Sequence, residues 1–287
     1  MPAPDHVGMD THPVLQGYVA YSRAELTRVN TRPAAARTEP AADAKLETVW
    51  ARHPHQVREA QRLRWRVFAS EMGARIVAPP GTPAGLDADA FDAHCEHLLV
   101  QTVETDDAPA QVVGTYRVLT PTAAARGGGL YSDKEFDLSR LAPLRPRIAE
   151  LGRSCVDPRF RTGGAILMLW AALADFMQRN GLDLTVGCAS ISMSDGGHTA
   201  ASLWNKLRRS HMAPDELAAR PYLPLPVEHL NGDLEVEPPA LIKGYLKCGG
   251  QVLGPPAWDP DFQTADLPMI MNLAHLPPAY RRRFLRG

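Results

Sequence analysis

The sequence has no long hydrophobic run. Its longest uninterrupted apolar stretch extends from Ala165 to Ala174 and ends at Asp175, well short of the roughly 20 residues that a membrane-spanning helix needs. The first residues, Met1 to Asp10, contain Pro, Asp and His, whereas a secretory signal has a basic start and an apolar segment. We therefore expect a cytoplasmic protein without a transmembrane segment.

The sequence also has no large excess of positive or negative charge. The 31 lysine and arginine residues nearly balance the 32 aspartate and glutamate residues, so no overall field attracts a nucleic acid or an anionic bilayer. Any basic site must be local.

Cysteine is scarce, and the four cysteines form no closely spaced pair such as C-x-x-C. Cys95, Cys155, Cys188 and Cys248 lie far apart in mostly apolar surroundings, which favours buried free thiols over a disulfide framework or a zinc site. The stretch His94 to His97 places two histidines three residues apart at the start of an expected strand, where they face opposite sides, so we expect no metal.

The chain is long enough, and with 45% hydrophobic residues apolar enough, to bury a sizeable core. Residues 1–45 are rich in Pro, Ala and Asp and have no apolar periodicity, so we predict a disordered extension there. Residues 46–287 are predicted to form one folded domain.

The order of elements predicts a mixed α/β fold. A strand and a helix ending at Gly73 come first, and EHLLVQTVE and AQVVGTYRVLT then form an antiparallel hairpin. The strand IAELGRSCVDP, an apolar helix from Gly163 to Arg179 and the strand LDLTVGCASIS form a crossover unit, which requires parallel pairing. A helix in ASLWNKLRRSHM and C-terminal strands complete the sheet.

The loop PRFRTGG within that crossover is a candidate phosphate site. Backbone N–H groups at a helix N-terminus can hold a phosphate, helped by Arg159 and Arg161. A tight turn between strand and helix needs glycines in any case. The loop lacks GK[ST] and GxGxxG, so it is neither a Walker loop nor a dinucleotide fingerprint.

The segment ELGRSCV carries Glu150 and Arg153, a pair that can deprotonate an amine and hold an anion. Residues three apart in a regular strand face opposite sides, so we predict a bulge near Gly152. Otherwise the pair is an ordinary surface ion pair. Further polar candidates are Arg66, Asp87, Asp89, Asp92 and Arg117, which form a site only if the fold brings them together.

These motifs together resemble the ornithine lipid N-acyltransferases of the GNAT superfamily, which are similar to acyl-homoserine lactone synthases. The resemblance covers roughly residues 45 to 285, and ELGRSCV followed by the apolar helix and GCAS is its most specific part. It is carried by the following segments in order: LRWRVFASEMGA, AFDAHCEHLLV, VVGTYRVL, YSDKEFDL, ELGRSCVDPRFR, ILMLWAALADF and VGCAS.

The resemblance implies a twisted mixed sheet flanked by helices, whose central parallel strands splay apart. It implies transfer of a 3-hydroxy fatty acyl group from acyl carrier protein to the α-amine of ornithine, without a permanently bound cofactor. It assigns the phosphopantetheine phosphate to Arg159, Arg161, Gly163 and Gly164. The functional cluster would comprise Glu150 and Arg153 as catalytic residues, and Arg66, Asp89, Asp92 and Arg117 as substrate-binding residues.

One departure from the GNAT pattern (Q/R)xxGx(G/A) concerns the donor. Arg161 and Gly164 fit the pattern, but Ile166 occupies its last position. A phosphate-binding loop with fewer binding groups suits an acyl carrier protein as donor. This donor presents the phosphate of its pantetheine arm but lacks the adenosine diphosphate part of coenzyme A.

Alternatives remain open at this point. The enzyme could acylate another amino acid instead of ornithine, or the chain could be a lactone synthase. It could also be a catalytically silent GNAT-like module. A further alternative is an enzyme that forms a covalent acyl intermediate on Cys155 or Cys188. The helix Gly163 to Arg179 and residues near Trp204 and Met212 are candidates for an acyl slot. The basic end YRRRFLRG is a candidate contact for the acidic carrier protein or for anionic lipid at the inner membrane face.

Overall fold

The computed structural model describes residues 44–284. The predicted extension over residues 1–45 therefore lies almost wholly outside the described residues, and its disorder stays a prediction. Within 44–284, no helix is both long and apolar enough to cross a bilayer.

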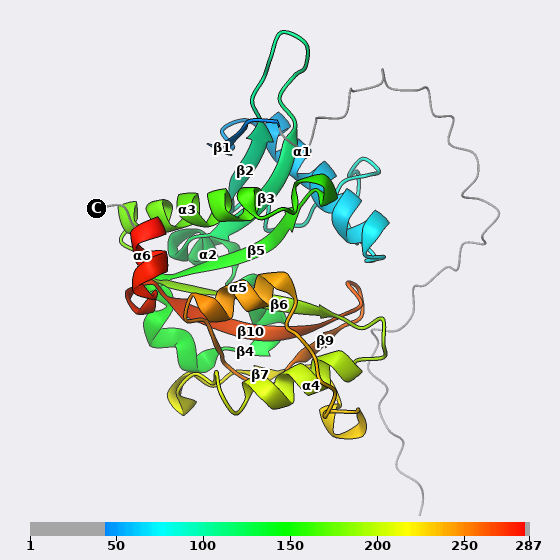
Figure 1. The fold of residues 1–287 in the computed structure, drawn as a ribbon, viewed down its shortest axis with the longest axis vertical. Coiled ribbons are helices and arrows are strands. Elements are labelled where there is room, and N and C mark those ends of the chain that lie inside the picture. The colour runs from blue at the N-terminus through cyan, green and yellow to red at the C-terminus, as the bar shows by residue number, and fades with distance from the viewer. Residues whose placement is uncertain (1–43, 285–287) are drawn as a thin grey trace, which may run out of the picture. The chain divides into compact units, whose positions relative to one another are not determined.

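The described residues form an eight-stranded mixed sheet with helices on both faces (Figure 1). Seven strands lie in the order β1, β2, β3, β5, β6, β10, β8, and β9 pairs with β10 beside β8. The strand bounds are β1 Leu46–Trp50, β2 Glu96–Thr102, β3 Val112–Leu119, β5 Ile148–Val156, β6 Leu184–Ser192, β8 Gln251–Val252, β9 Ala257–Asp259 and β10 Thr264–Asn272. A separate two-stranded ribbon pairs β4 Phe136–Asp137 with β7 Arg220–Pro221.

The three predicted helices, before Gly73, in residues 163–179 and in ASLWNKLRRSHM, are present, and the described residues form three further α-helices. The helix bounds are α1 Pro54–Trp65, α2 Pro121–Gly127, α3 Gly164–Arg179, α4 His198–Leu207, α5 Ala240–Lys247 and α6 Pro278–Phe284. A π-helical turn, Arg66–Glu71, continues α1, and Gly73 follows it with a φ of 79°, where glycine has no steric penalty. The segment between β3 and β5, which the sequence left without elements, contains α2 and the 3-10 helices Tyr131–Lys134 and Ser139–Arg147.

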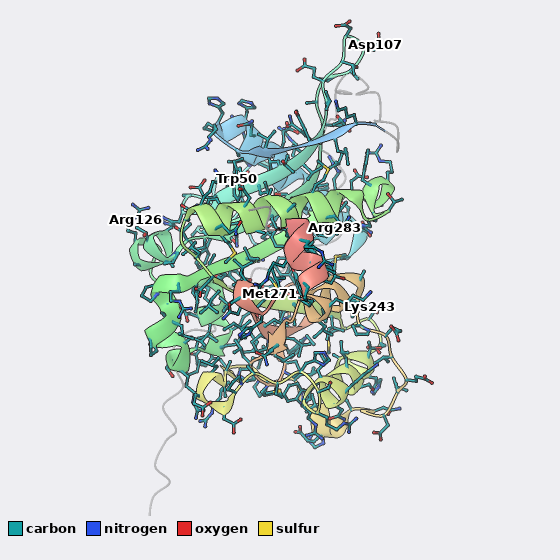
Figure 2. The ribbon with its side chains drawn as sticks, turned by 60° about the vertical axis from the view of Figure 1, so that its left-hand side comes forward. Trp50, Asp107, Arg126, Lys243, Met271 and Arg283 are labelled. Atoms are coloured by element: carbon teal, nitrogen blue, oxygen red, sulfur yellow. The ribbon has the colours of Figure 1, made fainter. Side chains whose placement is uncertain are left out.

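The predicted hairpin is confirmed, because β2 and β3 pair antiparallel. Its connection carries Asp107 away from the rest of the described chain (Figures 1 and 2). On one face of the sheet, α3 packs against β2, β3 and β5 through Leu169, Leu173 and Met177, all almost fully buried. The stripe forms because these positions recur at helical spacing.

The two central strands are the parallel pair that the crossover predicts, and they diverge. Residues Ile148 to Glu150 of β5 pair with Leu184 to Val186 of β6, and the pairing ends there. The strands meet so closely at this vertex that a Cβ atom on Gly187 would lie 2.3 Å from the carbonyl oxygen of Leu151. Figure 1 shows β5 and β6 separating beyond this point.

The bulge predicted near Gly152 is present. Arg117 pairs with Gly152 and Thr115 with Cys155, so Arg153 and Ser154 together oppose one residue of β3. Arg153 has a φ of 50°, an uncommon conformation for a residue with a side chain. The extra residue turns the Arg153 side chain to the same face of the sheet as Glu150.

Candidate functional site

A cavity of about 410 Å³ lies where β5 and β6 diverge. It is lined by every residue of β5 from Glu150 to Val156, so both faces of that strand border it. On one face its wall is apolar and comes from α3 and α5, through Ile166, Trp170, Leu241 and Tyr245. On the other face its wall carries the polar groups of Arg117, Glu150 and Asp266, beside Phe91 and Phe262. The cavity therefore joins the two faces of the sheet through the gap between the diverging strands.

Glu150 lies at the vertex of this gap with only 4% of its surface exposed. Its carboxylate accepts hydrogen bonds from the backbone N–H groups of Tyr131 and Ser132, at 2.6 and 2.7 Å, and from the Ser132 hydroxyl at 2.5 Å. Burial raises the pKa of Glu150, while these hydrogen bonds oppose the rise. The result is a fixed carboxylate whose affinity for a proton is increased.

Ser132 was not singled out in the sequence. It is the second residue of the 3-10 helix Tyr131–Lys134, and the N-terminus of this helix presents the N–H groups that hold Glu150. The phrase YSDKEFDL carried the resemblance, but nothing in its composition indicated that it packs against ELGRSCV. Only the long-range contact shows this.

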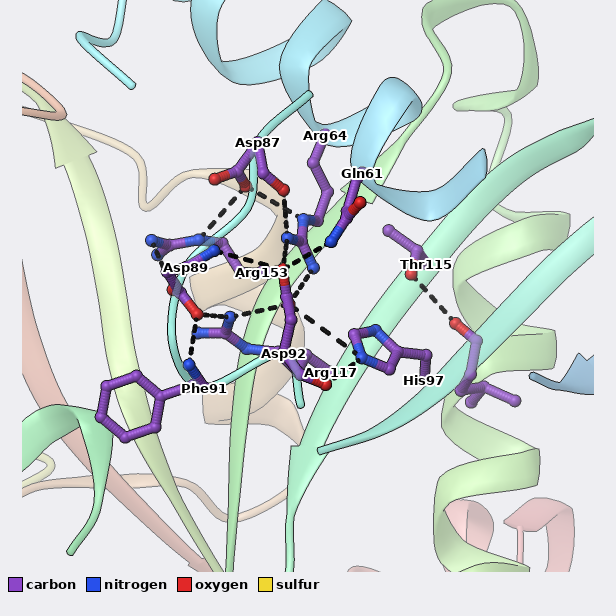
Figure 3. A network of polar contacts seen from close by, with 11 residues as sticks. Gln61, Arg64, Asp87, Asp89, Phe91, Asp92, His97, Thr115, Arg117 and Arg153 are labelled. Carbon is purple, nitrogen blue, oxygen red and sulfur yellow. Dashed lines mark hydrogen bonds and ion pairs between the residues drawn. The ribbon is translucent and has the colours of Figure 1, made fainter. Parts of the chain in front are cut away.

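Two residues of the polar wall, Arg117 and Arg153, belong to a network of three arginines and three aspartates (Figure 3). We call Arg64, Arg117, Arg153, Asp87, Asp89 and Asp92 the paired cluster. Arg64 bonds Asp87 at 3.0 Å and Asp92 at 2.8 Å, and Arg117 bonds Asp89 at 2.6 Å and Asp92 at 3.1 Å. Arg153 lies 3.3 Å from both Asp87 and Asp89.

The electrostatics of the paired cluster are balanced. Burial alone would raise the pKa of Asp92, but hydrogen bonds and the charges of Arg64 and Arg117 hold it well below its usual range. Burial opposes the charge on Arg117, yet Asp89 and Asp92 raise its pKa overall. The Arg153 guanidinium also lies over the rings of Phe262 and Tyr131, at 4.5 and 5.0 Å, and it borders the cavity.

The structure brings together Glu150, Arg153, Arg117, Asp89 and Asp92 from the predicted set. Arg66 lies elsewhere, with its side chain 51% exposed and 3.8 Å from Asp157. Its place in the cluster is taken by Arg64, which is fully buried. Both residues lie on the same helical segment, and helical periodicity separates them: Arg64 joins Ala60 and Leu63 on the buried face of α1.

The predicted phosphate loop leads into α3. Gly163 is the N-cap of that helix with a φ of 103°, and Gly164 is its first residue. Arg161 and Gly163 border the cavity, and the Arg161 guanidinium also pairs with Glu71 at 2.8 Å. Arg159 bonds Asp157 at 3.0 Å. The N-terminus of α3 thus opens at the mouth of the cavity.

The four cysteines are free thiols. Burial raises the pKa of Cys155 to about 12 and raises that of Cys188 well above its usual value, so neither is a thiolate near neutral pH. Trp204 and Met212 pack with the core around α4 and β10, and neither is among the described residues that line the cavity.

Sequence comparison identifies relatives. Residues 63–171 match the family model described as an acetyltransferase (GNAT) domain. An L-ornithine N(alpha)-acyltransferase of Rhizobium meliloti (strain 1021) is 36% identical over 248 residues, which cover 83% of this chain and 83% of that protein. The Rhodobacter capsulatus protein of the same name is 35% identical over 256 residues, covering 86% of this chain and 97% of the relative.

Solved structures are more remote. The AHL synthase LasI has a TM-score of 0.47 at 16% identity, covering 84% of this chain and 95% of its own. The N-acyl amino acid synthase FeeM, from uncultured soil microbes, has a TM-score of 0.45 at 12% identity, with coverages of 84% and 97%. At these values the structural likeness adds nothing to the sequence relationship. Identity above one third over most of both chains shows that this chain is an acyltransferase of the L-ornithine N(alpha)-acyltransferase family.

Proposed function

We propose that this chain transfers a 3-hydroxy fatty acyl group from the thioester of acyl carrier protein to the α-amine of ornithine, giving lyso-ornithine lipid. The observation that carries the proposal, beside the family, is the cavity through the sheet. It offers an apolar side for the acyl thioester and a polar side for an amino acid, and Glu150 lies where the two meet.

Glu150 acts as the general base in this proposal. An amine is mostly protonated near neutral pH and must lose a proton before it attacks the thioester carbonyl carbon. The buried carboxylate, with its raised pKa, takes that proton. The nitrogen then forms the new C–N bond, the C–S bond breaks, and Glu150 passes its proton to the leaving pantetheine sulfur. The ionised Glu150 then takes the second proton from the former amine nitrogen, which leaves a neutral amide, and releases that proton to solvent.

Backbone N–H groups of β5 stabilise the oxyanion of the intermediate. Beyond Glu150 this strand has no β6 partner, and the bulge at Arg153 distorts its pairing with β3. A backbone donor aimed at a developing oxyanion contributes on the order of 3 kcal/mol.

Arg153 and Arg117 hold the α-carboxylate of the acceptor, supported by Asp89 and Asp92, which fix both guanidinium groups. Arg66 contributes to binding from outside the paired cluster, with a half-exposed side chain near Asp157.

The donor phosphate binds at the turn before α3, through Arg159, Arg161, Gly163 and Gly164. Free N–H groups and positive potential at a helix N-terminus favour an anion. The exposed Arg281, Arg282 and Arg283 of α6 offer a basic surface to the acidic carrier protein or to an anionic membrane face. The substrates are thioester and amino acid, and no resident cofactor takes part.

The test is mass spectrometry of lipids from a host that lacks aminolipids and expresses the wild type or Glu150→Gln. We expect a new 3-hydroxyacyl-ornithine in the wild type and a loss of about 10²-fold or more in the variant, the range for removal of a general base. Glu216→Gln, an exposed glutamate far along the chain, is the matched control.

Folding of each variant is checked by circular dichroism. A folded Glu150→Gln protein that keeps full activity contradicts the base assignment. Absence of any acylated ornithine from soluble wild-type protein, with purified acyl carrier protein supplied, contradicts the proposed function and favours another acceptor or a silent module.

A further inference from the structure

A second group of carboxylates lies at the polar side of the cavity, which two of its three members, Asp259 and Asp266, line. Asp266 projects from β10, Glu135 follows the 3-10 helix that holds Glu150, and Asp259 ends β9 opposite Thr264. We call these three residues the acid cluster. Cys188 of β6 lies among them, because its Sγ atom and the carboxylate oxygens of Glu135 and Asp266 are all within 4.8 Å of one another.

The acid cluster has no cation. Among residues 44–284, no lysine, arginine or histidine forms an ion pair with any of its carboxylates. Both carboxylate oxygens of Glu135 and the Oδ1 atom of Asp266 have no hydrogen-bond partner in this part of the chain. Asp266 is only 4% exposed. Burying acidic groups without a partner costs free energy, so the arrangement needs an explanation.

An independent observation points to a ligand. The Thr264 hydroxyl lies on β10 two residues before Asp266, hence on the same face. Thr264 is 2% exposed and lines the cavity, and its Oγ1 atom forms no hydrogen bond of normal length and angle among the described residues, although it lies close enough to the Asp266 carboxylate to lower the pKa of that group. Buried hydroxyl groups are nearly always hydrogen-bonded. This part of the wall therefore presents several acceptor atoms that the protein leaves unused.

The acid cluster is close to the proposed base. The Ser132 hydroxyl donates to Glu150 at 2.5 Å and lies 3.3 Å from the Cys188 Sγ atom, which in turn contacts the region of Glu135 and Asp266. Two side chains, Ser132 and Cys188, thus connect the carboxylate that receives the α-amine to the carboxylates that have no cation. Four carbon atoms separate the two nitrogens of ornithine, so one molecule reaches both groups only if they are neighbours, as this series of contacts makes them.

We infer that the acid cluster, together with the Thr264 hydroxyl, binds the side-chain ammonium of the acceptor and makes the enzyme select a diamino acid over a neutral one. This inference rests on the proposed function. An ammonium group brings a positive charge, three N–H donors and no acceptor, which complements carboxylate and hydroxyl oxygens that have no cation beside them. The acceptor is then held at both ends, by Arg117 and Arg153 at its carboxylate and by the acid cluster at its side chain.

The protonation of the cluster agrees with an incoming cation. Burial, followed by the charges of neighbouring carboxylates, raises the pKa of Glu135 and of Asp266 in the protein without ligand. A bound ammonium reverses this effect, because an opposite charge within contact distance favours the ionised carboxylate.

The test compares ornithine with norvaline, which has the same carbon skeleton without the side-chain amine. Purified wild type, Asp266→Asn, Glu135→Gln and the control Glu216→Gln are assayed with 3-hydroxyacyl carrier protein. We expect the wild type to prefer ornithine by about 100-fold or more in kcat/KM, because a site built for a polar group rejects an analogue that lacks it. Asp266→Asn should reduce this ratio at least about tenfold, mainly through the KM for ornithine, and the control should keep it.

A ratio that stays the same in both Asp266→Asn and Glu135→Gln overturns the inference. If the wild type acylates neither amino acid, the proposed function fails, and calorimetric titration with ornithine and norvaline still decides the inference. Tighter binding of ornithine to wild type than to Asp266→Asn supports the ammonium site, and equal binding overturns it. Zinc chloride that binds the wild type but not Asp266→Asn, with activity lost in EDTA, reassigns the cluster to a metal and also overturns the inference.

Discussion

The paired cluster reaches the cavity through Arg117 and Arg153, and the acid cluster reaches it through Asp259 and Asp266. The two clusters accommodate buried charge in opposite ways. In the paired cluster each aspartate contacts at least one arginine, so the charges are neutralised before any ligand arrives. In the acid cluster Glu135, Asp259 and Asp266 have no cation among the described residues. The difference teaches that the first cluster can serve as a scaffold, whereas the second is complete only with a positively charged partner.

The largest effect is expected from breaking the paired cluster at Arg64. Arg64→Met leaves Asp87 and Asp92 buried with one partner fewer each, and removal of one member of a buried ion pair costs about 3–5 kcal/mol. Unfolding in urea measures the loss. Arg62→Ala on the same helix is the control, since the Arg62 side chain is 48% exposed and pairs only with Glu59, and it should change stability by less than about 1 kcal/mol. Equal effects of the two substitutions contradict a scaffold role.

An intermediate effect is expected in the pH dependence of stability. Burial and then the charges of Asp266 and Asp259 raise the pKa of Glu135, so the folded protein keeps a proton that the unfolded chain releases. The stability from this group is present at low pH and is lost as pH rises above the ordinary carboxyl range. Glu135→Gln should therefore lose less stability than wild type between about pH 6 and about pH 8, by on the order of 1–2 kcal/mol.

Asp92 in the paired cluster should give a pH dependence of stability opposite to that of Glu135. Burial is outweighed there by Arg64 and Arg117, which lower the pKa of Asp92, so its contribution is present above the ordinary aspartate pKa and is lost as pH falls below it. Asp92→Asn should flatten the acid side of the stability profile and leave the difference between about pH 6 and about pH 8 as in wild type. Urea unfolding at each pH provides both readings. If Glu135→Gln and Asp92→Asn showed the same dependence of stability on pH, the proposed difference between the two clusters would be wrong.

The smallest effect is expected from the thiols. Cys188 lies between Glu150 and the acid cluster, and Cys155 lies among the apolar residues under α1. Burial raises the pKa of both, which makes them poor nucleophiles. Cys188→Ala and Cys155→Ala should each change kcat by less than about threefold, measured with saturating acyl carrier protein and ornithine. A folded but inactive Cys155→Ala protein would establish the covalent route instead.

Much of the fold follows from local sequence. Alternating apolar residues specify the hairpin of β2 and β3, and the apolar stripe with Asn180 and Gly181 after it specifies α3. The bulge at Arg153 was also predictable, because Glu150 and Arg153 can share a site only if the strand is irregular. The segment between β3 and β5 was not predictable to the same degree, because its short helices depend on packing against β5 more than on periodicity.

The candidate site also has a part that the sequence predicts and a part that only the tertiary structure reveals. The sequence by itself determined the acyltransferase family, the order of elements and the presence of Glu150 and Arg153 beside a turn into a helix. Tertiary structure alone decided that Arg64 and not Arg66 joins the aspartates, that Ser132 holds Glu150, and that Glu135, Asp259 and Asp266 meet without a cation. The physical reason is that these groups come from segments far apart in the chain, and the divergence of β5 and β6, a property of the whole sheet, brings them to one cavity.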